Sequence, residues 1–175
     1  MNDLIQTIKI FEPNELKIVN DYIDTLKFED CKVFGSRGEN YVNPNIRSSS
    51  GLTMPENETV FIGGHPIMGD KKNTITLLLH QCINRGLEIY SAKVKRIHQN
   101  FSYYPVPCGI GTKCWREGIQ ILEYRCGQKY IFHHDAATDK NLKEYERKLS
   151  IILYLNDDFE GGGTEFIKKQ VLKPE

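Results

Sequence analysis

The chain has 175 residues, enough for one compact domain, which most often holds about 100–150 residues. Its 39% hydrophobic and 26% charged residues are typical of globular proteins and exclude an intrinsically disordered chain. Lys plus Arg and Asp plus Glu each number 23, so no overall field attracts nucleic acid or an anionic membrane, and we expect neither as a partner.

The N-terminus and the cysteines bear on the cellular compartment. Met1-Asn2-Asp3 opens without the basic start or apolar run of a signal peptide, and no stretch approaches the ~20 apolar residues of a membrane span. The five cysteines form no C-x-x-C pair and their odd number does not suggest a disulfide framework, although Cys108 and Cys114 could close a small loop under oxidising conditions. We therefore expect a cytoplasmic protein with free thiols.

The first half of the chain predicts two helices separated by irregular structure. Apolar residues recur at three- and four-residue steps over residues 12–26, which is typical of an amphipathic helix. Residues 31–55 are rich in Gly, Asn, Ser and Pro and predict short strands and loops. A second helical pattern covers residues 73–97, as one long or two short helices, because Gly86 weakens the run.

The last third predicts strands. After a Tyr-, Pro- and Gly-rich connection, residues 119–125, 129–135 and 149–156 have β-type spacing, and a fourth strand begins at Thr164. Gly127-Gln128 predicts a turn between the first two strands, and three glycines precede the fourth. Helices followed by strands indicate an α+β or mainly β domain.

Two residues of the second strand point to metal chemistry. Side chains two positions apart on a strand project to the same face, so His133 and Asp135 are expected to point together, away from His134. A His and a carboxylate are two of the three ligands in the facial triad of non-haem Fe(II) oxygenases. H-x-D alone is weak evidence, because a histidine on a strand is more often a hydrogen-bonded structural residue.

The surrounding blocks, in order, resemble the prolyl 4-hydroxylase family of 2-oxoglutarate- and Fe(II)-dependent dioxygenases. Residues 120–135 are similar to the family pattern Q-x-L-x-Y-x-x-G-Q-x-Y-x-x-H-x-D, residues 147–156 to R-x-x-T-x-x-x-Y-L-N, and residues 161–166 to G-G-x-T-x-F. Upstream, Arg47-Ser48-Ser49-Ser50-Gly51 resembles the family segment R-T-S-x-G.

The resemblance implies a fold and a domain plan. The expected fold is a double-stranded β-helix, a cupin-like jelly roll with N-terminal supporting helices and its last strands missing. Residues 1–175 would form a single dioxygenase domain, truncated at its C-terminus. Residues 1–118 would supply helical support and the first strands, and residues 119–175 would form the first part of the metal-binding core.

The resemblance also implies residue roles. His133 and Asp135 would bind Fe(II), while Tyr124, Tyr154 and Thr164 would contact 2-oxoglutarate, and Tyr130 and Arg147 the substrate. From the residues alone, the tyrosines could simply pack as strand residues, Arg147 could be a surface charge, and the segment from Arg47 could be a polar loop. Ser150 stands where the family usually has Thr.

The implied reaction hydroxylates prolyl residues of a peptide or protein while 2-oxoglutarate is decarboxylated to succinate, with L-ascorbate rescuing oxidised iron. The family's distal His ligand and the basic residue that pairs with 2-oxoglutarate are not visible, since no His follows His134. Upstream, His65, His80 and His98 match no family ligand and are expected to be structural or surface residues.

Three alternatives therefore stay open: an active dioxygenase of which this is a part, an inactive interaction module, and a zinc hydrolase with an unidentified third ligand. The exact substrate and the oligomeric state are not indicated by any pattern in the chain.

Overall fold

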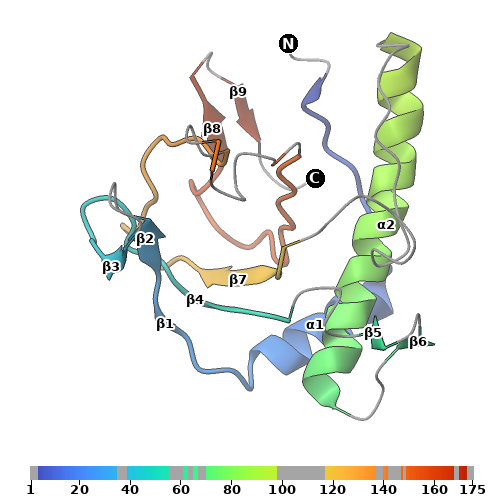
Figure 1. The fold of residues 1–175 in the computed structure, drawn as a ribbon, viewed down its shortest axis with the longest axis horizontal. Coiled ribbons are helices and arrows are strands. Elements are labelled where there is room, and N and C mark those ends of the chain that lie inside the picture. Colours follow the sequence, from blue (N-terminus) through green and yellow to red (C-terminus); the bar gives the residue numbers. More distant parts are fainter. Residues whose placement is uncertain are drawn as a thin grey trace. The chain divides into compact units, whose positions relative to one another are not determined.

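The computed structural model describes residues 4–34, 39–55, 61–62, 65–66, 70–97, 117–136, 140–141, 147, 149–167 and 170–172 (Figure 1). The chain forms two compact units. Met1–Glu29 with Gly51–Leu122 is here called the helical unit, and Asp30–Ser50 with Glu123–Glu175 the strand unit. The expected single dioxygenase domain stays a prediction.

The first predicted helix is confirmed as α1, Pro13–Ile23. Pro13 occupies the first turn, where its missing N–H costs no hydrogen bond, and the Glu12 amide donates to the Glu15 carboxylate at 2.9 Å. The helix ends at a turn in which the Thr25 hydroxyl donates to the Tyr22 carbonyl at 2.7 Å. Its buried face centres on Val19 and Tyr22.

The second helical pattern forms one continuous helix, α2, Lys71–Ile97. It begins after Asp70, whose carboxylate accepts a hydrogen bond from the Lys72 amide at 2.9 Å. The predicted apolar face lies in the core, with Ile75, Leu79, Cys82 and Ile83 all buried. Among the described residues, no helix is long and apolar enough to cross a membrane.

Gly86 does not break α2, and its environment explains why a glycine stands there. A Cβ atom at this position would lie 3.0 Å from Cγ2 of Ile10, which is closer than nearly all real contacts. The glycine therefore lets the N-terminal segment lie against the helix. The expected weakness in the helix is offset by this packing.

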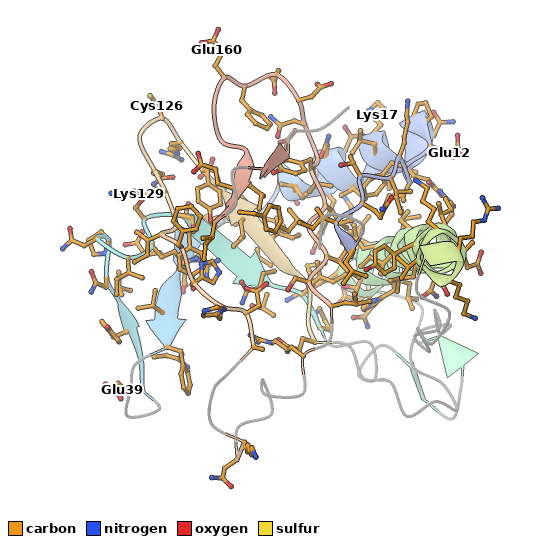
Figure 2. All side chains as sticks on the ribbon, turned by 90° about the horizontal axis from the view of Figure 1, so that it is seen from above. Glu12, Lys17, Glu39, Cys126, Lys129 and Glu160 are labelled. Atoms are coloured by element: carbon orange, nitrogen blue, oxygen red, sulfur yellow. The ribbon has the colours of Figure 1, made fainter. Side chains whose placement is uncertain are left out.

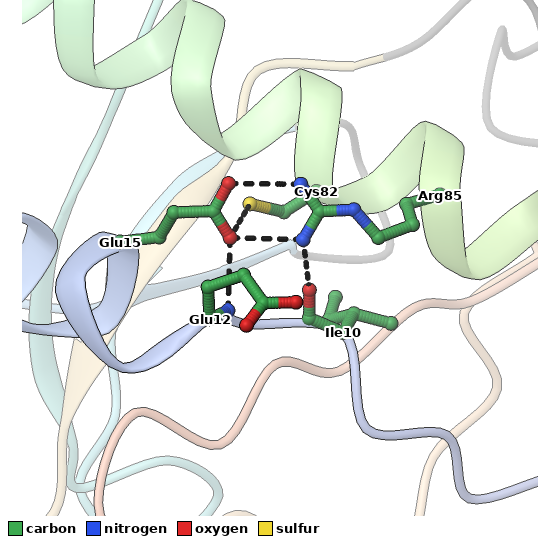
Figure 3. A network of polar contacts seen from close by, with 5 residues as sticks. All are labelled: Ile10, Glu12, Glu15, Cys82 and Arg85. Carbon is green, nitrogen blue, oxygen red and sulfur yellow. Dashed lines mark hydrogen bonds and ion pairs between the residues drawn. The ribbon is translucent and has the colours of Figure 1, made fainter.

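A polar network joins α1, α2 and the N-terminal segment (Figure 3). The Arg85 guanidinium donates to both carboxylate oxygens of Glu15, each at 2.8 Å, and also to the carbonyl of Ile10. The hydrogen bonds from Arg85 lower the pKa of Glu15 to about 2. Burial raises the pKa of the neighbouring Cys82 thiol to about 11, so this cysteine is a core thiol and not a reactive thiolate.

We predict that Glu15→Gln lowers the free energy of unfolding by about 2 kcal/mol at pH 6, the typical value of a charge-assisted hydrogen bond. The folded-state pKa of Glu15 lies below the ordinary value of 4.5, so its contribution is complete above pH 4.5 and is lost as the pH falls toward about 2. Urea unfolding of both proteins from pH 6 to pH 2 should show the difference shrinking in that window.

Asp21→Asn is the matched control for this prediction. Asp21 pairs with Lys17 at 2.6 Å, but both side chains are more than half exposed. Such pairs contribute little, so the substitution should change stability by less than about 0.5 kcal/mol. An equal loss in both variants would mean that Glu15 has no special role.

The predicted short strands of residues 31–55 are confirmed. β1 (Glu29–Asp30), β4 (Ser50–Thr53) and β7 (Gln120–Glu123) form a three-stranded sheet in the order β1-β4-β7. β2 (Lys32–Phe34) and β3 (Asn40–Val42) form an antiparallel hairpin in which Val33 is paired with Tyr41. Two further antiparallel pairs are β5 (Phe61–Ile62) with β6 (His65–Pro66) and β8 (Thr164–Phe166) with β9 (Gln170–Leu172).

The strand predictions of the last third were right in part. β7 lies within residues 119–125, and β8 begins at Thr164 as expected. The predicted strands at residues 129–135 and 149–156 were wrong, since the structure assigns no strand to residues 131–136 or 149–159 and only an isolated bridge to Tyr130. β-type spacing favours extended backbone, but a strand also needs a continuous ladder with a neighbour.

The fold class is thus mixed, with two long helices and several antiparallel strand pairs, in agreement with the expected α+β composition. The structure does not confirm a full double-stranded β-helix, which stays a prediction. The connection at residues 101–116, including Cys108 and Cys114, lies outside the described residues, as do the side chains of His65 and His98. His80 is buried in α2, as expected for a structural residue.

Candidate functional site

A tight turn leads from β7 into the candidate site. Gly127 has φ of 78°, a conformation that L side chains rarely adopt, and the Gln128 amide donates to the Arg125 carbonyl at 2.9 Å. Figure 2 shows Cys126 at the tip of this turn and Lys129 on the returning segment. The predicted Gly-Gln turn is confirmed.

The returning segment is fixed to the segment that begins at Arg47. The Ser48 amide donates to the Lys129 carbonyl at 2.9 Å, and the Ile131 amide donates to the Ile46 carbonyl at 3.0 Å. These bonds flank the isolated bridge between Arg47 and Tyr130. Two blocks that are 83 positions apart in the sequence are therefore neighbours within the strand unit.

Arg47 is buried between its neighbours and does not belong to a solvated polar loop. Its side chain is only 7% exposed, its guanidinium lies 4.8 Å from the centroid of the Tyr130 ring, and its Nε donates to the Ser49 hydroxyl at 3.0 Å. Burial is the main cause of a raised pKa at Tyr130, which keeps the phenol protonated. The Tyr130 ring in turn stacks on the His133 ring with centroids 3.7 Å apart.

His133 and Asp135 point together, although not by the predicted route. Nε2 of His133 lies 3.2 Å from Oδ1 of Asp135, while Nδ1 lies 2.8 Å from the Ile131 carbonyl oxygen. A carbonyl only accepts hydrogen bonds, so Nδ1 carries a proton and Nε2 is the ring nitrogen that faces Asp135. A bend, and not a strand, brings the two side chains together.

This pair fits a divalent metal ion. Two ligand atoms at neighbouring positions of an octahedral ion, each bonded at about 2.1 Å, lie about 3.0 Å apart. The observed 3.2 Å is close to this value, and a metal-binding His commonly donates from its other ring nitrogen to a backbone carbonyl, as Nδ1 does here. Among the described residues, no third His, Cys, Asp or Glu completes a metal-binding group.

Asp135 is held at two further atoms by the segment at residues 147–150. The Ser150 hydroxyl donates to Oδ2 of Asp135, and Nη1 of Arg147 donates to the Asp135 carbonyl oxygen at 2.6 Å. In the sequence, Ser150 stood out only as a departure from the family pattern, and its contact with Asp135 was not predicted. Its position three residues after Arg147, where the family has another hydroxyl residue, could have indicated it.

Two of the predicted cosubstrate residues contact each other. The hydroxyls of Tyr154 and Thr164 are 2.8 Å apart, and the Thr164 amide donates to the Tyr154 hydroxyl at 3.1 Å. Tyr154 also stacks on Phe159, with ring centroids 6.2 Å apart. The third predicted cosubstrate residue, Tyr124, is exposed just after β7 and influences the pKa of Tyr130 electrostatically.

Comparison with known proteins gives these contacts a context. Residues 119–175 match the model of the 2OG-Fe(II) oxygenase superfamily. The chain is 40% identical over 86 residues to prolyl 4-hydroxylase 1 of Arabidopsis thaliana, covering 48% of this chain and 28% of that protein. It is 29% identical over 100 residues to prolyl 4-hydroxylase 5 of the same plant, covering 56% and 32% respectively.

A third relative is probable prolyl 4-hydroxylase 8 of Arabidopsis thaliana, which is 31% identical over 86 residues, 48% of this chain and 27% of that protein. The chain is therefore similar to plant prolyl 4-hydroxylases over about half of its length. It spans about a third of the length of these relatives. No solved structure matches it significantly.

The match to the 2OG-Fe(II) oxygenase superfamily implies a jelly-roll fold for residues 119–175, and that superfamily uses Fe(II) as cofactor and 2-oxoglutarate as cosubstrate. The matched segment begins at residue 119 and so includes the turn, the His133–Asp135 pair and the Tyr154–Thr164 contact. Arg47 lies upstream of the matched family model, and the structure joins it to this region.

Substitutions of Arg47 test how strongly its contacts stabilise the strand unit. Arg47→Ala removes a buried hydrogen bond and a cation–π contact, so we predict a loss of about 2 kcal/mol in the free energy of unfolding. Arg47→Lys should recover little, because an ammonium group lacks the planar fork that reaches both Ser49 and Tyr130. Urea unfolding at neutral pH measures both variants.

The control is Arg125→Ala. Arg125 pairs with the Glu123 carboxylate at 3.3 Å, but its side chain is 75% exposed. Exposed pairs typically contribute less than about 1 kcal/mol, so this variant should unfold close to the parent. A parent-like Arg47→Ala protein would show that the buried guanidinium does not stabilise the strand unit.

Proposed function

We propose that this chain is the iron-binding part of a dioxygenase that uses Fe(II) and 2-oxoglutarate to hydroxylate prolyl residues of a peptide or protein. The observation that carries the proposal is the 3.2 Å approach of the His133 imidazole to the Asp135 carboxylate, inside the segment that matches the oxygenase family. The printed names of the relatives support proline as the target residue.

His133 and Asp135 would hold the iron through Nε2 and Oδ1. When bound, ferrous iron would supply the oxidising chemistry, in which 2-oxoglutarate and O₂ give succinate and CO₂, with one oxygen atom of O₂ entering succinate and the other a substrate C–H bond. The Ile131 carbonyl holds the proton on Nδ1, and Tyr130 stacks on the ring, so the direction of Nε2 is fixed.

The remaining predicted residues are proposed to bind the organic molecules. Tyr124, Tyr154 and Thr164 would surround a carboxylate of 2-oxoglutarate, to which a hydroxyl group can donate a hydrogen bond. Tyr154 is held in place by Thr164, so its ring direction is fixed before any ligand arrives. L-ascorbate is proposed as the reductant that restores ferrous iron.

Tyr130 and Arg147 are proposed to contact the substrate peptide. The protonated Tyr130 phenol can donate a hydrogen bond to a peptide carbonyl. Arg147 donates through Nη1 to the Asp135 carbonyl oxygen, which places a positively charged guanidinium beside Asp135, where a substrate peptide would bind.

Substitution of the two adjacent histidines, His133 and His134, tests the proposed metal site. His133→Ala should weaken the binding of Fe(II) or its air-stable substitute Mn²⁺ at least tenfold, because one of the two ligands is lost. His134→Ala removes the adjacent exposed imidazole and should leave metal affinity unchanged, since that ring has no part in the proposed site. Isothermal titration calorimetry measures both variants.

Turnover is tested separately from metal binding. Fe(II), 2-oxoglutarate and ascorbate are added with a proline-containing peptide, and succinate and hydroxyproline should form in equal amounts, with both products lost in His133→Ala. Metal binding without any succinate would favour an inactive interaction module. Hydrolysis that needs zinc but not oxygen would contradict the dioxygenase and favour a zinc hydrolase.

A further inference from the structure

The two carboxylate oxygens of Asp135 have different neighbours. Oδ1 faces Nε2 of His133 at 3.2 Å, whereas Oδ2 accepts a hydrogen bond from the Ser150 hydroxyl. A carboxylate is otherwise free to rotate or to offer both oxygens to one metal ion. An external donor on one oxygen limits both motions.

The same segment also holds the backbone of Asp135. Arg147, three residues before Ser150, donates to the Asp135 carbonyl oxygen at 2.6 Å. The peptide unit and the far carboxylate oxygen are thus both fixed by residues 147–150. This segment does not bind the other carboxylate oxygen, Oδ1, which is directed at His133.

We propose that Ser150 is a positioning residue that makes Asp135 a one-oxygen metal ligand. Its hydroxyl occupies Oδ2 and thereby directs Oδ1 toward the position shared with Nε2 of His133. A threonine would offer the same hydroxyl, whereas alanine or valine would release Oδ2. The inference rests on the metal site of the proposed function and adds a residue that does not touch the metal.

The test compares Co²⁺ binding to the 175-residue chain and its variants, followed by the visible absorption of the bound ion. S150A should bind Co²⁺ about 10- to 100-fold more weakly than the parent, the usual cost of losing a partner of a metal ligand. The absorption band of the bound ion should also change in intensity, because a released carboxylate can bind through both oxygens and alter the coordination number.

S150T and S150V form a matched pair of nearly equal shape that differ by a hydroxyl and a methyl group. S150T should bind within threefold of the parent, and S150V should behave like S150A. Ser50→Ala is the control for a lost serine–carboxylate bond elsewhere, since the Ser50 hydroxyl donates to Glu123 at 3.2 Å. It should leave Co²⁺ affinity and the spectrum unchanged.

The outcomes separate this inference from the proposed function. A parent chain that binds no Co²⁺ would overturn both the metal site and the role of Ser150. A parent that binds, together with S150A and S150V variants of equal affinity and spectrum, would overturn the positioning role alone. Thermal unfolding of the metal-free variants checks that they fold, and if S150A does not, the S150T and S150V pair decides.

Discussion

The candidate site depends on the close approach of an imidazole nitrogen and a carboxylate oxygen. Nδ1 of His133 lies against the Ile131 carbonyl, so that Nε2 faces Oδ1 of Asp135 at 3.2 Å. A proton on Nε2 or a metal ion between the two atoms would stabilise this approach. The first gives an ordinary ion pair, and the second is the arrangement on which the proposed function rests.

The ring of His133 is oriented by a chain of contacts that begins far away in the sequence. Arg47 is buried beside Ser49 and lies over Tyr130, and Tyr130 stacks on His133. Backbone bonds on either side of the Arg47–Tyr130 bridge keep these side chains in register. The upstream segment that begins at Arg47 therefore contributes to the candidate site by positioning Tyr130 and, through it, His133.

Sequence patterns predicted the elements that depend on residues close together in the chain. They failed where contacts between distant residues determine the structure. The helices follow from apolar spacing around Val19 and Leu79, and the turn at Gly127 follows from the need for a positive φ. The segment around His133 was expected to be a strand, but a ladder requires a partner that spacing does not reveal. The pairing of His133 with Asp135 was expected for the wrong geometric reason, and the contact of Ser150 with Asp135 depends on a fold-back of 15 positions that no periodicity encodes.

The two units rely on different forces. The helical unit buries residues such as Ile75, Leu79 and Val94, so its stability depends mainly on apolar packing, with the Glu15–Arg85 pair as a polar addition. Around the site, in contrast, Ile131 and Phe132 are exposed, the latter by 61%, and so are Ile151 and Ile152. The described contacts that hold His133 and Asp135 are therefore hydrogen bonds and ring stacking.

Because such contacts are directional, a single lost hydroxyl can move a ligand atom without unfolding the chain, whereas apolar packing adjusts over many atoms. The geometry of the site should accordingly be more sensitive to polar substitutions than the stability of the protein is.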